Sequence, residues 1–251
     1  MAIYLKKFET QAAYEAAESG LILPNVSLTL DNNTVHYNPS SPVPPTPSHD
    51  YVEIGGLKWA TMNIGANSVT DGGLFFQWGD TQGYTASQVG SGAGQKYFGW
   101  EDYKYGGNDS GGQTKYNETD GKTVLESSDD AVTAAWGGNW RMPTQDEYFT
   151  LSEAVTTAWT ADYEGSGVAG LVLTDNDDSN KKLFFPACGL AYDGSVNNVG
   201  SRGGCWHSSL NSYDGSYLAY NLSFNNSNVD WDNYYGSSRS IGMPVRGVLD
   251  E

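Results

Sequence analysis

The chain has 251 residues, 38% hydrophobic and 13% aromatic, so it can bury a core and is too apolar to be disordered throughout. Its formal net charge of −17 argues against nucleic acid and anionic membrane surfaces as partners, because both attract clustered Lys and Arg. The 31 glycines and the scarcity of long helical patterns favour a loop-rich fold that contains β-strands.

Few residues are available for metal or disulfide chemistry. Cys188 and Cys205 cannot form a disulfide framework, and with three His and no CxxC or HExxH spacing a zinc site is not expected. We expect no cofactor. The start of the chain has no apolar stretch after its charges, so no signal peptide and no export by the common signal route are expected. No run approaches the about 18 apolar residues of a membrane span.

Residues 1–37 predict a small helix-hairpin unit. Phe8–Ala17 fits a short helix with Thr10 as its cap, and Val26–Leu30 and Thr34–Tyr37 fit two strands around a turn. A unit this small needs a packing partner, such as a neighbouring subunit. Residues 38–50 follow as a linker, because five of the nine prolines lie there. An SH3-type ligand is the alternative interpretation of this segment.

The second domain is expected at residues 51–251. Val52–Ile54 and Leu57–Trp59 fit two short strands, and Gly73–Trp78 is an apolar run. A helix is expected from Asp129 to Trp136, capped by Ser127 or Ser128 and ended by Gly137-Gly138.

A second helix is expected after Pro143. Thr144 would be its cap and Glu147 would complete a capping box, with the helix continuing to Val155. Gly170–Thr174 and Lys182–Phe185 then predict a β-hairpin. Its acidic tip, residues 175–180, could suggest calcium, but Asn and Asp are ordinary turn formers and the pattern lacks the Gly and final Glu of an EF-hand.

Residues 197–239 differ in composition from the rest of the chain. Thirty of these 43 positions are Asn, Ser, Tyr, Asp or Gly, and residues 183–242 contain no Lys, Glu, Gln or Met. Low-complexity disorder is one explanation, but the alternation of Leu218, Tyr220, Leu222 and Phe224 with Ala219, Asn221 and Ser223 favours a strand with one apolar face. Antibody paratopes use the same residue types for recognition, although these residues are also common in loops.

A series of motifs along residues 51–249 resembles the Fibrobacter succinogenes major paralogous domain family, which is related to the C-type lectin fold and the formylglycine-generating-enzyme fold. These motifs are Gly56–Gly65, Gly73–Asp80, Asp129–Ala131, Trp136–Thr144 with Glu147, Leu183–Ala187 and Pro244–Arg246. The resemblance implies an α+β class, C-type lectin-like fold with two helices and twisted antiparallel sheets.

The end of the chain, from Gly203–Ser209 through Ala219–Phe224 to Arg246, resembles the variable region of diversity-generating retroelement target proteins. In such proteins, template adenines are copied with errors, which turns Asn codons into many others but not into those of Lys, Glu, Gln, Met or Trp. The resemblance implies a ligand-binding variable region at about 197–246, in which Trp206, Leu222, Phe224 and Trp231 hold the frame and Gly203-Gly204 keeps loops close to the sheet. The expected variable side chains that contact a ligand are Arg202, Cys205, His207, Asn211, Tyr213, Asp214, Tyr217, Asn221, Ser223, Asn225, Asn226, Asn228, Asp230, Asp232, Asn233, Tyr234, Tyr235 and Ser237.

The first 37 residues resemble amino-terminal segments of phage structural proteins from gut bacteria, on Pro24–Ser27 and Val35–Pro39. The resemblance implies a virion protein that attaches to a surface protein or glycan of a host bacterium and contacts other virion proteins through this unit; a homo-oligomer is possible. The bacterial cell surface is the alternative location. A structural or adhesin-like surface protein without diversification is the alternative function.

Catalysis and metal binding are not expected. The cysteines and histidines form no recognisable nucleophile–base–orienter set, and Arg141 with Glu147 is better explained as a buried structural ion pair. The triplets that bind calcium in lectins are absent, and Trp231-Asp-Asn233 is only similar to one of them.

Overall fold

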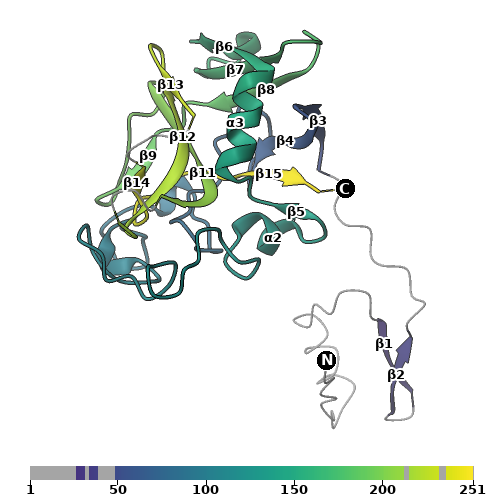
Figure 1. Cartoon of the computed structure of the whole chain (residues 1–251), viewed down its shortest axis with the longest axis vertical. Helices are drawn as coiled ribbons and strands as arrows, with labels where there is room; N and C mark the ends of the chain where they lie inside the picture. The colour runs from purple at the N-terminus through teal and green to yellow at the C-terminus, as the bar shows by residue number, and fades with distance from the viewer. Residues whose placement is uncertain (1–26, 32–33, 39–48, 212–214, 232–235, 251) are drawn as a thin grey trace. The chain divides into compact units, whose positions relative to one another are not determined.

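The computed structural model describes residues 27–31, 34–38, 49–211, 215–231 and 236–250, the first two stretches by their backbone (Figure 1). The chain separates into two units, Met1–Ser48 and His49–Glu251. The fold is mixed α+β, with two α-helices and several antiparallel sheets in the described residues. The helix predicted at Phe8–Ala17 lies outside them.

The first unit contains the predicted hairpin. Strands β1 (Ser27–Asp31) and β2 (Thr34–Asn38) pair antiparallel, with Asp31 opposite Thr34. The hairpin is confirmed, but each strand ends one residue later than predicted, so Asp31 belongs to β1 rather than to the turn.

The second unit begins and ends in one sheet of four strands, in the order β3-β4-β15-β5. Strands β3 (Tyr51–Ile54) and β4 (Leu57–Asn63) confirm the first predicted pair. Strand β15 (Arg246–Leu249) lies between β4 and β5 (Trp140–Arg141) and is antiparallel to both. The last strand of the domain therefore holds together elements from its beginning and its middle.

Helix α2 (Ala131–Trp136) confirms the first predicted helix but not its cap. The Asp130 carboxylate, rather than Ser127 or Ser128, accepts a hydrogen bond from the Thr133 N–H at 2.9 Å. Asp130 also accepts from the Met142 N–H, so it serves the helix and the following strand together. The helix ends at Gly137, whose φ of 65° suits glycine.

Helix α3 (Gln145–Ala154) has the predicted capping box. The Thr144 hydroxyl accepts from the Glu147 N–H, and the Glu147 carboxylate accepts from the Thr144 N–H at 2.7 Å. This box satisfies two of the backbone donors that a helix start leaves free.

The predicted hairpin is confirmed as β7 (Gly170–Asp175) and β8 (Lys182–Pro186), and β6 (Val155–Thr160) pairs with β7 to complete a three-stranded sheet. At its tip the Asp175 carboxylate accepts from the backbone N–H groups of Asp177 and Asp178, as in an ordinary Asx turn. The apolar run Gly73–Trp78 forms two isolated bridges, from Phe75 to Tyr84 and from Phe76 to Met243, rather than a strand. Strands β9 (Leu190–Tyr192) and β10 (Ser195–Asn197) form a further hairpin. The short 3-10 helices are η1 (Ala86–Gln88), η2 (Trp100–Asp102) and η3 (Tyr163–Gly165).

The segment of unusual composition forms the remaining sheet. Strand β11 (Arg202–Asn211) pairs with β12 (Leu218–Asn225), and the short strands β13 (Val229–Asp230) and β14 (Ser237–Ser238) pair with β12. The long strands β11 and β12 lie beside α3 in Figure 1. This sheet therefore has a helix over one face, which the sequence pattern did not predict.

Both faces of β11 and β12 contribute to the core. Cys205, Leu222 and Phe224 belong to a buried cluster that includes Tyr148 of α3, whereas Trp206 and Ala219 belong to a second cluster around Trp78. Successive strand residues point to opposite faces, so the two clusters lie on either side of the sheet. The predicted polar face of β12 is consequently wrong for Ala219 and Asn221, both 0% exposed.

Within the part of the chain that the structure describes, no helix has the length and apolar character needed to cross a membrane.

Candidate binding surface

The eighteen side chains expected to contact a ligand fall into four groups. Exposed are Asn226 and Asn228. Half-buried are Arg202, Tyr217, Ser223, Asn225, Asp230 and Ser237. Buried are Cys205, His207, Asn211 and Asn221. Outside the described residues are Tyr213, Asp214, Asp232, Asn233, Tyr234 and Tyr235.

For Cys205 and His207 the expected ligand contact is wrong in this structure. Cys205 is 1% exposed and His207 is 0% exposed. The His207 ring stacks on the Tyr148 ring of α3, with centroids 4.0 Å apart. Helix α3 thus covers the face of β11 to which both side chains point, and a ligand on the surface cannot reach them.

Asn211 and Asn221 are also inaccessible. Asn221 lies opposite Trp206 in the β11–β12 ladder, and its amide donates to the Leu222 carbonyl at 3.2 Å. Asn211 is the last residue of β11 and lies close to Gly236. A Cβ atom added to Gly236 would be only 2.9 Å from the side-chain amide nitrogen of Asn211. These two amides support the sheet and its adjoining loop rather than a ligand.

Three of the four residues expected to hold the frame are buried. Trp206, Leu222 and Phe224 are at most 2% exposed, and the Trp206 indole donates to the Phe76 carbonyl at 2.8 Å. Trp231 is half-buried and packs on the same cluster as Phe224. Gly203 and Gly204 lie inside β11, not in a loop, and a Cβ on Gly203 would come within 2.1 Å of the Phe224 ring.

The exposed part of this segment includes an ordered turn between β12 and β13. The Asn225 side-chain oxygen accepts from the N–H groups of Ser227 and Asn228, and the Asn225 N–H donates to the Asn228 carbonyl at 2.9 Å. Beside it, Arg202 donates to the Ser223 hydroxyl at 3.2 Å. Polar side chains are therefore presented at this end of the sheet on a backbone held by its own hydrogen bonds.

Arg239 is a structural residue that the sequence did not reveal. It is 0% exposed, and its guanidinium donates to the carbonyls of Lys115, Tyr116 and Ser216 at 2.9, 3.0 and 2.5 Å. It also lies 4.7 Å from the Trp78 ring centroid, close enough for a cation–π contact. Arg239 thereby joins the loop at 103–126 to Ser216, two residues before β12.

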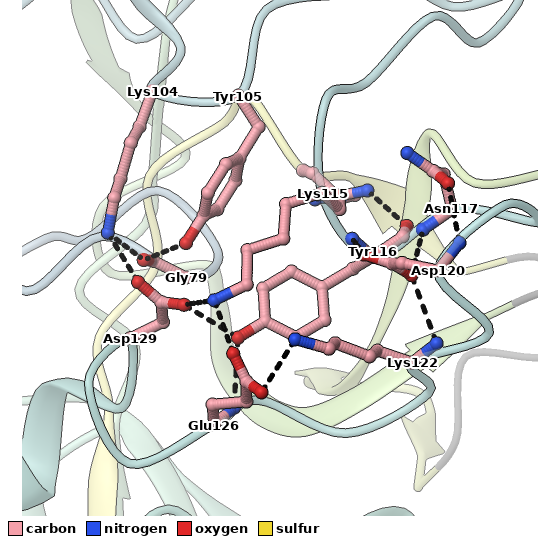
Figure 2. A network of polar contacts seen from close by, with 11 residues as sticks. Gly79, Lys104, Tyr105, Lys115, Tyr116, Asn117, Asp120, Lys122, Glu126 and Asp129 are labelled. Atoms are coloured by element: carbon pink, nitrogen blue, oxygen red, sulfur yellow. Dashed lines mark hydrogen bonds and ion pairs between the residues drawn. The ribbon is translucent and has the colours of Figure 1, made fainter.

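Asp129 also holds the 103–126 loop in place, through contacts with three of its side chains (Figure 2). The Asp129 carboxylate accepts from Lys104 at 2.7 Å, from the Tyr116 hydroxyl at 2.7 Å and from Lys115. Lys115 also contacts Glu126 at 2.6 Å. Burial acts to raise the Asp129 pKa, but the hydrogen bonds from Lys104, Lys115 and Tyr116 outweigh it and the pKa lies below its ordinary value.

Burial together with the Asp129 contact raises the pKa of Tyr116 to about 12, so its hydroxyl stays a donor at neutral pH. The Lys115 pKa is raised by its hydrogen bonds to Asp129 and Glu126. Asp129 and Lys115 therefore stay charged, and Tyr116 stays neutral, over the neutral range. Their geometry supports a rigid loop rather than proton transfer.

Arg246, part of one of the sequence motifs, has a similar role at the end of the chain. It is fully buried and donates to the Asn63 side chain at 2.8 Å and to the Ala60 and Phe184 carbonyls, both at 3.0 Å. Burial lowers its pKa to about 10, so it remains charged at neutral pH. Arg246 ties β15 to β4 and β8.

The ion pair expected between Arg141 and Glu147 is present, with a shortest N–O distance of 2.5 Å. Both side chains are half-buried rather than fully buried, and Arg141 also contacts Asp250 at 2.6 Å. The pair fastens β5 to the start of α3 and to the residue after β15. Among the described residues, no group of three His, Cys, Asp or Glu side chains is arranged to hold a metal ion.

No protein-family model, curated protein or solved structure matches this chain significantly. The family resemblance therefore rests on the sequence motifs and their order along the chain.

Proposed function

We propose that the second unit is a C-type lectin-like ligand-binding domain whose region 197–246 is diversified by a retroelement, and that it attaches a phage to the surface of a host bacterium. The observation that carries this proposal is that the buried and the surface residues of region 197–246 have different roles. Buried residues such as Trp206, Phe224 and Arg239 fix its backbone, while the turn at Asn225–Asn228 and the half-buried Tyr217 reach the surface. Such a division allows surface residues to change while the frame persists.

The pKa values and burial of Cys188, Cys205 and His207 support a binding role for the domain over a catalytic one. Burial raises the pKa of Cys188 to about 12 and also raises that of Cys205. A nucleophilic cysteine needs a lowered pKa and a nearby base. Burial lowers the pKa of His207 well below its usual value, and its ring packs between strand and helix without access to a substrate.

The binding proposal is tested with the fluorescently labelled full chain and candidate host bacteria. Tyr217→Ala with Asn226→Ala should reduce cell binding at least tenfold. The matched control, Tyr51→Ala with Asn180→Ala, changes the same residue types at distant positions and should bind as the parent does. If Tyr217→Ala with Asn226→Ala binds cells as well as the control variant does, the cell contact does not involve these residues and the proposed surface is overturned.

The diversification proposal is tested in the DNA. A near-copy of the sequence encoding residues 197–246 should lie close to the gene and to a reverse transcriptase gene, and should differ at template adenines. Differences spread over all four template bases would refute diversification of this kind. Mass spectrometry of purified particles tests the virion location, and peptides found in the cell envelope instead would favour the bacterial surface.

A further inference from the structure

The loop at 103–126 and residues Gly215–Tyr217, which directly precede β12, line two recesses. The larger, of about 330 Å³, is bounded on one side by Ser110–Gln113 and Asn117–Thr119 and on the other by Gly215–Tyr217. The smaller, of about 110 Å³, shares Asn117, Glu118, Gly215 and Ser216 with it and extends to Leu210. The two form one concave surface at the edge of the diversified segment.

The wall formed by residues 108–122 is held rigid although it contains no helix or strand. The Asp120 carboxylate accepts from the backbone N–H groups of Tyr116, Asn117 and Lys122 at 2.7, 3.0 and 3.0 Å. The Asn117 amide donates to the Gln113 carbonyl at 2.7 Å. A ligand would therefore meet a preformed wall and would not have to order it.

The two walls are fastened to each other. The Ser216 hydroxyl donates to the Gln113 side-chain oxygen at 2.9 Å, and Arg239 bonds to the carbonyls of Tyr116 and Ser216. Behind them the Leu125 N–H donates to the Ser208 carbonyl, and the Leu210 N–H donates to the Thr123 carbonyl at 2.8 Å. The recess is thus a fixed feature of the domain.

The chemistry of the larger recess favours an uncharged, hydroxyl-rich ligand. The residues that line it include Ser110 and Thr119, which carry hydroxyls, the acidic Glu118 and the amphipathic Tyr217. Among the described residues that line the larger recess there is no Lys, Arg or His to hold an anion. Lys122, which lines the smaller recess, is paired with Glu126 at 2.6 Å. The volume of the larger recess lies at the lower end of the about 300–1,000 Å³ of small-ligand sites, whereas a protein partner covers about 800 Å² of open surface.

We infer that residues 110–119, outside the diversified segment, form one wall of a composite binding site whose other wall is Gly215–Tyr217, and that the ligand it takes is a neutral glycan. This inference rests on the proposed function, because it names the ligand class and extends the surface. The region 197–246 then changes one wall of the recess and leaves the other constant.

The test uses the full chain on an array of neutral and acidic mono- to tetrasaccharides, with binding to whole host bacteria measured in parallel. Thr119→Trp fills the recess and should weaken glycan and cell binding at least tenfold. Ser110→Trp is an independent variant at the opposite end of the same wall. Thr157→Trp, an equally exposed change on β6, is the matched control and should bind as the parent does. Thermal melting confirms that each variant folds.

The outcomes separate this inference from the proposed function. Binding of neutral glycans that both recess variants lose supports it. Glycan binding that folded Thr119→Trp and Ser110→Trp retain overturns the composite site, and a preference for acidic sugars overturns the ligand class. Binding to cells that is absent from the array and destroyed by protease treatment of the bacteria identifies a protein receptor and overturns the glycan while sparing host attachment. No binding to cells or glycans overturns both.

Discussion

The His207 imidazole lies parallel to the Tyr148 phenol, with ring centroids 4.0 Å apart and planes inclined by 14°. Within the described residues, neither imidazole nitrogen has a hydrogen-bond partner. A titratable ring is therefore buried at the junction of β11 and α3 without compensation for its polar atoms.

This arrangement predicts that stability falls below neutral pH. Burial holds the folded pKa of His207 well below that of the unfolded chain, so the unfolded state takes up a proton first as pH falls through about 6.5. The stabilisation is thus present above that pH and is lost below it, by about 1–2 kcal/mol between pH 7 and pH 5. His207→Phe keeps an aromatic ring on Tyr148 and should flatten this part of the profile. Urea unfolding at a series of pH values measures it, and equal slopes for both chains would contradict the assignment.

Asp129→Asn should destabilise the domain by about 2–3 kcal/mol, because Lys104 loses its carboxylate partner and Lys115 keeps only Glu126. The pKa of Asp129 is lowered in the fold, so its contribution is present above the unfolded value near 3.9 and is lost as pH falls toward the folded pKa. Chemical denaturation at pH 7 measures the difference. Asp177→Asn, at the β7–β8 turn, is the matched control and should change stability by less than about 0.5 kcal/mol.

Arg239→Lys should cost about 2–3 kcal/mol although it keeps the charge. A lysine ammonium cannot reproduce the planar set of donors that reaches Tyr103, Lys115, Tyr116 and Ser216. Amide hydrogen exchange should accelerate at residues 115–117 and 216–217, where the two loops lose their connection. Arg202→Lys, which loses one hydrogen bond to Ser223, is the control. Unchanged exchange at both loops would show that Arg239 does not join them.

Gly203→Ala should destabilise by about 1–3 kcal/mol, because the new methyl group would overlap the Phe224 ring across the strand pair. Phe224→Leu removes part of that ring. In a double-mutant cycle the cost of Gly203→Ala should therefore be smaller in the Phe224→Leu background. Additive costs would mean that the contact with Phe224 is not the reason for glycine at this position.

Local elements of this fold follow from the sequence because their determinants lie within a few residues. The Thr144–Glu147 capping box and the β7–β8 hairpin are examples. The cap of α2 was assigned two or three residues too early, since Asp130 and the two serines are all good cap residues and the bond from Met142 to Asp130 depends on tertiary structure. The place of Arg246–Leu249 between β4 and β5 could not be predicted, because these two strands are distant from it in the chain.

The candidate surface was predicted less completely. The composition of 197–239 identified the segment, but alternation could not show that α3 covers the Cys205 and His207 side of β11. Nor could it show that Arg239 binds the carbonyls of Lys115 and Tyr116, more than a hundred residues earlier in the chain. Position within a strand predicts which residues share a face, whereas the exposure of that face depends on what packs against it.

The central place of β15 between β4 and β5 has a consequence for synthesis on the ribosome. The sheet that includes Tyr51–Ile54 cannot close until the chain has been translated through Leu249 and has left the exit tunnel. A frameshift or premature stop anywhere in 197–246 would remove the strand that joins the first and middle parts of the domain. Truncated products would lack this central strand, so full-length translation is a precondition for display of this surface.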